Sequence, residues 1–154
     1  MSMYRRILVP LDGSPTSERG LSEAIGLAAQ MHAVLRLLHV ADDFQTLAGI
    51  GSIQGFHDKA DGLRRHGEAL LATARAACAK AGVAVEASLR EVTRQTVADA
   101  IVQEATDGAC DLIVMGTHGR RGIARLTMGS EAELVLRASP MPVLLVREHG
   151  GETS

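Results

Sequence analysis

Short apolar runs and longer stretches of helical periodicity alternate along the chain. Two runs, Ile7–Leu11 and Asp111–Met115, are apolar almost throughout, which is typical of strands covered on both faces. Val34–Val40 is also largely apolar and predicts a further strand. Apolar and more polar residues alternate in Val83–Leu89, and prolines precede Val143–Val146, so these two segments are predicted to be edge strands.

Stretches with apolar residues at helical spacing connect the strands. The first follows Ser14, a predicted N-cap, and Pro15 at the first helical position. The others are Lys59–Ala81, a helix that begins at Thr93, and Ser130–Ala138. Because strands and helices alternate, the sequence predicts the α/β class: a single open five-stranded parallel sheet with right-handed crossovers and helices on both faces.

The length of the chain indicates its domain organisation. A chain of 154 residues suits one domain. Its core is expected over about residues 4–147, followed by a flexible tail at 148–154. The longest segment without a clear period is Ala41–Asp58, which contains three glycines, and we predict an irregular loop there.

Composition narrows the classes of function. Aromatic residues make up 2% of the chain and Trp is absent, which argues against a stacking platform for single-stranded nucleic acid. A formal net charge of -2 creates no field that would attract DNA or an anionic membrane. No apolar run reaches the roughly 20 residues of a membrane span. Cys78 and Cys110 have neither metal-binding nor redox spacing, so we expect a cytoplasmic protein with small core cysteines, and no nucleic-acid or membrane partner.

One glycine-rich segment carries candidate chemistry. Gly116 ends a predicted buried strand, Gly119 comes three residues later, and Gly129 and Ser130 stand where the next helix begins. Ligands of open α/β sheets lie beyond the carboxyl ends of the strands, and glycines let the backbone approach a phosphate closely. The amides of Gly129, Ser130 and Glu131 would lie at a helix N-terminus, which favours an anion. The segment therefore predicts a phosphate site.

Charged neighbours leave alternatives open. Arg120 and two further arginines of the same segment could donate charge-assisted hydrogen bonds to a phosphate. Ser130 and Glu133 could instead form a capping box that completes the helix end without a ligand. Glu131 and Glu133 would repel phosphates if they pointed inward. Either they face solvent, or a metal bridges them to the phosphates, or the site is emptier than the glycines suggest.

Three segments of the chain resemble one protein family. The spacing G-x2-G-x9-G-S/T, from Gly116 to Ser130, resembles the nucleotide-binding signature of universal stress proteins. Ile7–Ser14 and Ser139–Val146 are similar to the beginning and the end of that family's domain. The resemblance covers about Arg5 to Arg147, which is nearly the whole chain, and it points to the ATP-binding branch of the family.

This resemblance implies a fold, a ligand and a partner. The fold is the Rossmann-like one of the adenine nucleotide alpha-hydrolases, with sheet order 3-2-1-4-5. The ligand is ATP, with Mg or Mn on its phosphates, across the carboxyl ends of the first and fourth strands. The last strand pairs with its twofold mate in this family, which implies a homodimer through Val143–Val146. By the same resemblance, Pro10 and Asp12 flank the adenosine, the Val40 backbone meets the adenine, Met115 and Gly116 line the ribose side, and Gly119, Arg120, Gly129, Ser130 and Glu131 surround the phosphates.

Three functions are consistent with the sequence. The preferred one is an ATP-binding switch of the stress response. The alternatives are a homodimeric interaction module that holds no ATP or another ligand such as a cyclic nucleotide, and a slow ATPase or self-phosphorylating enzyme. Hydrolysis needs a residue that positions water, but Asp12 and His118 have no visible partner, so no catalytic residue or metal ligand is assigned. Asp12 could also simply hold its turn, since Asp-Gly is a common turn pair.

Overall fold

The strands form one parallel sheet in the computed structural model, which describes residues 3–42, 53–117 and 129–148. The order is β3-β2-β1-β4-β5, which confirms the predicted order and places β3 and β5 at the edges. In the central strand, Ile7 is in register with Leu35 on one side and with Leu112 on the other. The strands are β1 (Arg6–Pro10), β2 (Val34–Asp42), β3 (Val85–Val92), β4 (Leu112–Thr117) and β5 (Val143–Arg147).

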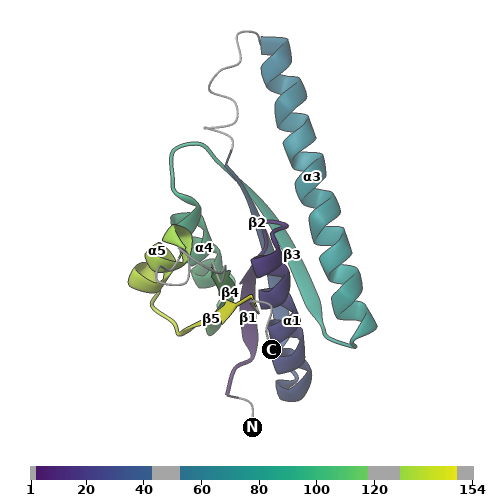
Figure 1. Cartoon of the computed structure of the whole chain (residues 1–154), viewed down its shortest axis with the longest axis vertical. Helices are drawn as coiled ribbons and strands as arrows, with labels where there is room; N and C mark the ends of the chain where they lie inside the picture. Colours follow the sequence, from purple (N-terminus) through teal and green to yellow (C-terminus); the bar gives the residue numbers. More distant parts are fainter. Residues whose placement is uncertain (1–2, 43–52, 118–128, 149–154) are drawn as a thin grey trace, which may run out of the picture.

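Helices cover both faces of the sheet, as predicted. Figure 1 shows α1 and α3 on one side of the sheet and α4 and α5 on the other. No helix in the described parts of the chain is long and apolar enough to cross a membrane. The helices are α1 (Pro15–Met31), α3 (Ile53–Lys80), α4 (Val97–Asp107) and α5 (Ser130–Ala138).

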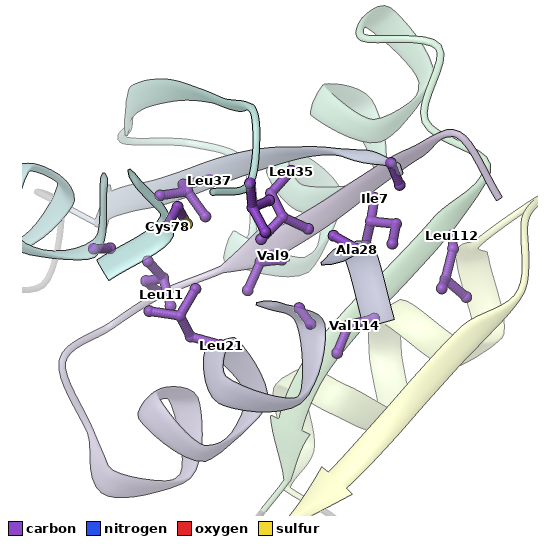
Figure 2. Packing of buried hydrophobic residues seen from close by; sticks show 14 of the residues in the cluster. Ile7, Val9, Leu11, Leu21, Ala28, Leu35, Leu37, Cys78, Leu112 and Val114 are labelled. Carbon is purple, nitrogen blue, oxygen red and sulfur yellow. The ribbon is translucent and has the colours of Figure 1, made fainter. Parts of the chain in front are cut away.

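Two hydrophobic cores hold the central strand in place. Ile7 and Val9 point into the core beneath α1 and α3 (Figure 2), whereas Leu8 points into the core beneath α4 and α5. Burying one such side chain contributes about 1.5–3 kcal/mol. Cys78 and Cys110 are buried and free, one in each core, as expected. The two cores together fix the position of the carboxyl end of β1.

The segment Ala41–Asp58, predicted to be an irregular loop, is regular at both ends. β2 continues to Asp42, and α3 already begins at Ile53. The first turns of α3 stand beyond the sheet (Figure 1) and are mostly exposed, with Gln54 donating to the Asp58 carboxylate at 3.1 Å. Because side chains that face water need not be apolar, the pattern of apolar residues could not reveal this part of the helix.

The start of α4 also differs from the prediction. The helix begins at Val97 and not at Thr93, and the hydroxyl of Thr96 accepts a hydrogen bond from the Asp99 amide at 3.0 Å. Both threonines suit an N-cap. β3 extends to Val92, however, so the chain is still leaving the sheet where the helix was expected to begin.

An ion-pair ladder crosses the sheet under α4, and the sequence pattern did not reveal it. Glu104 of α4 is only 2% exposed, and its carboxylate accepts from Arg36 Nε at 2.6 Å and from Arg90 Nε at 2.5 Å. Arg36 also pairs with Glu86, which pairs in turn with Arg6 at 2.7 Å. These charges tie β1, β2 and β3 to α4.

Candidate functional site

A cavity of about 150 Å³ opens at the carboxyl ends of β1 and β4. The structure describes eight of the ten predicted binding residues, and all eight line this cavity. Gly119 and Arg120 lie outside the described residues. The residues brought together are Pro10, Asp12, Val40, Met115, Gly116, Gly129, Ser130 and Glu131.

The strand order explains why the cavity forms here. β1 and β4 are neighbours in the sheet, but β1 leads through α1 to β2 on one side and β4 leads through α5 to β5 on the other. The two connections therefore diverge from the sheet and leave a crevice between them, which is the usual ligand position in open α/β sheets. A single buried water needs only about 10–15 Å³, so this cavity has room for a larger molecule.

Apolar side chains form the inner wall of the cavity. Leu38 and Val40 come from β2, Met115 from β4, and Val97 and Ile101 from α4. Val40 and Met115 were predicted from the sequence, and the other three were not. Val97 and Ile101 lie four positions apart and so share one face of α4. Which strand they face depends on how α4 packs across the sheet, and the sequence pattern carries no such information.

The turn between β1 and α1 forms one polar rim of the cavity. The Asp12 carboxylate accepts from the Ser14 amide at 2.9 Å, and Gly13 has a φ of +84°. Ser14 caps α1 as predicted, because its hydroxyl accepts from the Ser17 amide at 3.2 Å. Burial alone would raise the pKa of Asp12, but hydrogen bonds from Ser14 and Ser17 outweigh burial and keep this pKa below its ordinary value. Asp12 therefore holds its turn and also lines the cavity.

The N-terminus of α5 forms the opposite rim and has no side-chain cap. The N-cap is Gly129 and not Ser130, so the predicted capping box of Ser130 and Glu133 does not form. Ser130 is already the first helical residue, and the Glu133 carboxylate pairs with Arg137 at 3.0 Å instead. The first helical bond runs from the Glu133 amide to the Gly129 carbonyl at 3.0 Å. The amides of Ser130, Glu131 and Ala132 therefore have no partner within the helix.

Glu131 and Glu133 have different environments, although both lie in the first turn of α5. The Glu133 carboxylate points to Arg137 and lines neither the cavity nor the groove beside it. Glu131 lines the cavity and is exposed as a residue. Partial desolvation of its carboxyl group and the carboxylates of Asp42 and Asp99 raise its pKa above its ordinary value and outweigh the Ala98 amide, which lowers it. Within the described ranges, no three His, Cys, Asp or Glu side chains are grouped to hold a metal ion. Of the alternatives for this pair, solvent exposure thus applies to both glutamates, and Glu131 also lines the cavity.

The structure gives Gly116 a packing role that the sequence analysis did not foresee. A Cβ atom on Gly116 would collide with the backbone carbonyl of Thr16 in the first turn of α1. A Cβ atom on Gly20 would in turn stand 3.0 Å from the Gly116 amide nitrogen. Two glycines thus let α1 lie directly on the end of β4. Close approach of α1 is by itself enough to require glycine at position 116.

Thr117 links the two ends of the glycine-rich segment. Its side chain is buried at the end of β4, and its hydroxyl accepts from the Gly129 amide at 3.4 Å. Thr16 and Ser17 of α1 add further hydroxyl groups to the same cavity. None of the three was predicted from the sequence. Thr16 and Ser17 stand near a helix start, where hydroxyl residues are expected from capping alone, and Thr117 ends a strand with no distinguishing pattern.

Comparisons with known proteins agree with this geometry. The model of the universal stress protein family matches residues 3–147. A universal stress protein of Thermus aquaticus, from the QAH/OAS sulfhydrylase 3′ region, is 33% identical over 94% of this chain and all of its own length. A solved family member from Burkholderia pseudomallei is 34% identical, with a TM-score of 0.74 over 95% of this chain and 98% of its own. A universal stress protein solved in complex with cAMP is 27% identical, with a TM-score of 0.68 over 96% and 99%.

Proposed function

The chain belongs to the universal stress protein family, and from that premise we propose that it binds ATP and acts as a nucleotide-dependent switch in the stress response. The observation that carries the proposal is the uncapped N-terminus of α5, which borders a cavity with an apolar inner wall. An adenine nucleotide has the matching parts, a flat base with apolar faces and a chain of anionic phosphates.

The apolar wall suits the base. Leu38, Ile101 and Met115 offer surfaces for the faces of an aromatic ring, and such walls are typical of small-molecule pockets. As the family resemblance implies, we propose that the Val40 backbone lies at the adenine edge and Asp12 beside the adenosine. The hydrogen bonds that keep the Asp12 carboxylate in place would hold it in a fixed position for the ligand.

The phosphates are proposed to lie at the start of α5. Free amides of Ser130 and Glu131, together with the positive end of the helix dipole, favour an anion there. α1 and α4 also begin at this end of the sheet, but a side-chain cap, Ser14 or Thr96, already occupies one amide in the first turn of each. We propose that Mg or Mn arrives as the counterion of the phosphates, and no protein ligand is assigned to it.

Two alternatives remain as outcomes of the test. An interaction module with a different nucleotide draws support from the relative solved with cAMP. A hydrolase is less well supported, because hydrogen bonds to Asp12 lower its pKa and make this carboxylate a poor general base. Native purification followed by mass spectrometry of bound nucleotides, then calorimetry with ATP, ADP, AMP and cAMP, with and without magnesium, ranks these functions.

Gly129→Asp is expected to weaken ATP binding about 30-fold, or by about 2 kcal/mol, because its carboxylate would repel the phosphates and occupy the helix amides. Asp is a favourable N-cap, but Gly129 is buried, so the melting temperature of the variant is measured alongside its affinity. Gly62→Asp adds the same charge to α3 and serves as the matched control. A Cβ atom added at Gly62 would meet nothing within 4 Å. Calorimetry of the three proteins checks this; equal ATP affinities would place the phosphates elsewhere.

We also propose a homodimer through the edge strand β5, at Val143–Val146. The free edge of β5 offers unpaired backbone groups, and Leu144 is 39% exposed beside them. Leu144→Lys is expected to weaken dimerisation at least tenfold, because a lysine in the interface loses hydration and adds like charges across a twofold axis. Leu136→Lys is the control, because Leu136 lies on α5 and is 45% exposed. Analytical ultracentrifugation measures both, and a monomeric wild type at micromolar concentration would contradict the proposal.

A further inference from the structure

Glu131 forms part of the wall between two hollows. It lines the candidate nucleotide cavity and also a groove of about 480 Å³ on the outer side, next to Thr93, Arg94 and Leu134. It lies two residues after Gly129, the N-cap residue of α5, which makes no side-chain hydrogen bond to the helix. Its own amide is therefore one of the free donors, and its carboxyl group lies in the same turn as the proposed phosphate position.

The charged groups around this carboxyl group are mostly negative. The charges of Asp42, at the end of β2, and of Asp99, in the first turn of α4, act on it, and the Ala98 amide of α4 opposes them. Asp12 lines the same cavity from the turn after β1, and Arg94 lines the outer groove. The described residues that border the two hollows thus include one guanidinium, that of Arg94, and the carboxylates of Asp12, Asp42 and Glu131. A phosphate that entered here would add further negative charge next to Glu131.

We propose that Glu131 takes up a proton from solvent when the nucleotide binds, so that affinity for the phosphates increases as the pH falls. This inference rests on the proposed nucleotide binding. A neutral carboxyl group removes the repulsion that an ionised one exerts on a nearby phosphate. Because the phosphate and the carboxylate disfavour each other, phosphate binding and protonation of Glu131 favour each other, and this coupling is reciprocal.

The sign of the pH dependence follows from the groups involved. Partial desolvation, Asp42 and Asp99 raise the pKa of Glu131 before any ligand binds and outweigh the Ala98 amide, which lowers it. A bound phosphate acts in the same direction as the two carboxylates. Proton uptake is therefore expected at mildly acidic pH, above the ordinary pKa of a glutamate. Asp12 does not contribute in this window, because its pKa is lowered and it stays ionised. The phosphate itself titrates near pH 6, and comparison with a variant removes that contribution.

Calorimetry can isolate the proton that Glu131 takes up. ATP and uncharged adenosine are titrated into the wild type, Glu131→Gln and the control Glu133→Gln at pH 5.5, 6.5 and 7.5. Each titration is run in two buffers of different ionisation enthalpy, which gives the number of protons taken up. Glu133→Gln removes a carboxylate from the same helical turn, but one that pairs with Arg137. Glu131→Ala is a second variant that lacks the carboxyl group without introducing an amide.

Glu131→Gln is expected to bind ATP about tenfold more tightly than the wild type at pH 7.5, with a difference below about threefold at pH 5.5. Proton uptake should decrease in both Glu131 variants and stay at the wild-type value in Glu133→Gln. Adenosine affinity should change less than about twofold, because adenosine carries no phosphate charge. Equal ATP affinity and equal proton uptake in Glu131→Gln and Glu133→Gln would overturn this inference alone. Absence of ATP and adenosine binding in all proteins would overturn the proposed function and this inference with it.

Discussion

Glu104→Ala is expected to lower the free energy of unfolding by about 2–3 kcal/mol, because it removes a buried carboxylate that two arginines share, whose side chains are 25% and 28% exposed. Both Glu104 oxygens are used, one by Arg36 and one by Arg90, and the side chain itself is almost fully buried. In the variant Arg36 would keep its pair with Glu86 and Arg90 its pair with Asp107, so part of the charge compensation would remain. Urea or thermal unfolding measures the loss.

Asp107→Ala is the matched control for this prediction. Asp107 also pairs with Arg90, at 3.0 Å, but its side chain is 53% exposed, so solvent screens the pair and the variant should unfold almost like the wild type. If Glu104→Ala were as stable as Asp107→Ala, the ladder would not stabilise the fold.

The Glu104 contribution should also depend on pH. Burial alone would raise the pKa of Glu104, but the hydrogen bonds and charges of Arg90 and Arg36 outweigh burial and lower it. Because the folded-state pKa is below the unfolded one, the stabilisation is fully present above about pH 4.5 and is lost as the pH falls through the folded-state value. Glu104→Gln should therefore show a shallower loss of stability on acidification than the wild type. Parallel pH profiles would contradict the assignment.

Gly116→Ala is expected to destabilise the fold by about 2–3 kcal/mol, since its methyl group would displace α1 from the end of β4. The atom in the way is the carbonyl oxygen of Thr16, and backbone cannot rotate aside as a flexible side chain can. Gly26→Ala, within α1 itself, provides the contrast. Gly26 is exposed, and a Cβ atom there would meet nothing within 4 Å. It should stabilise the protein by about 0.5–1 kcal/mol, because alanine suits a helix interior better than glycine.

Melting curves of the two glycine variants, recorded without nucleotide, separate the two roles of Gly116. A lower melting temperature for Gly116→Ala in the ligand-free protein supports the packing role. Wild-type stability combined with weaker ATP binding would instead support the role predicted from the sequence, in which Gly116 approaches the ligand.

The sequence predicted the sheet well because its central strands are covered on both faces. Val9 and Val114 belong to apolar runs whose only stable place is the middle of a sheet with helices on both sides. The exposed first turns of α3 gave no such signal. The ladder could not be predicted, since Arg36 and Glu104 are 68 positions apart and meet only when α4 packs over β2.

The candidate site was predicted residue by residue through family resemblance, and its local chemistry was not. Ser130 follows a glycine and precedes Glu133, which fits a capping box, yet the helix begins one residue earlier than that motif requires. Helix boundaries shift by a residue without any change in the apolar pattern. Glu131 and Glu133 are equivalent in the sequence, and only the packing of α5 against α4 gives them different neighbours.

A two-dimensional NMR titration of the uniformly ¹⁵N-labelled protein with ATP tests the central claim most directly. The amides of Gly129, Ser130 and Glu131 should shift in a saturable manner, together with the amide of Asp12 across the cavity. Amides in the last turn of α3, on the other face of the sheet, should not move. Saturable shifts confined to another part of the surface, or no shifts at millimolar ATP, would contradict a nucleotide site at the N-terminus of α5.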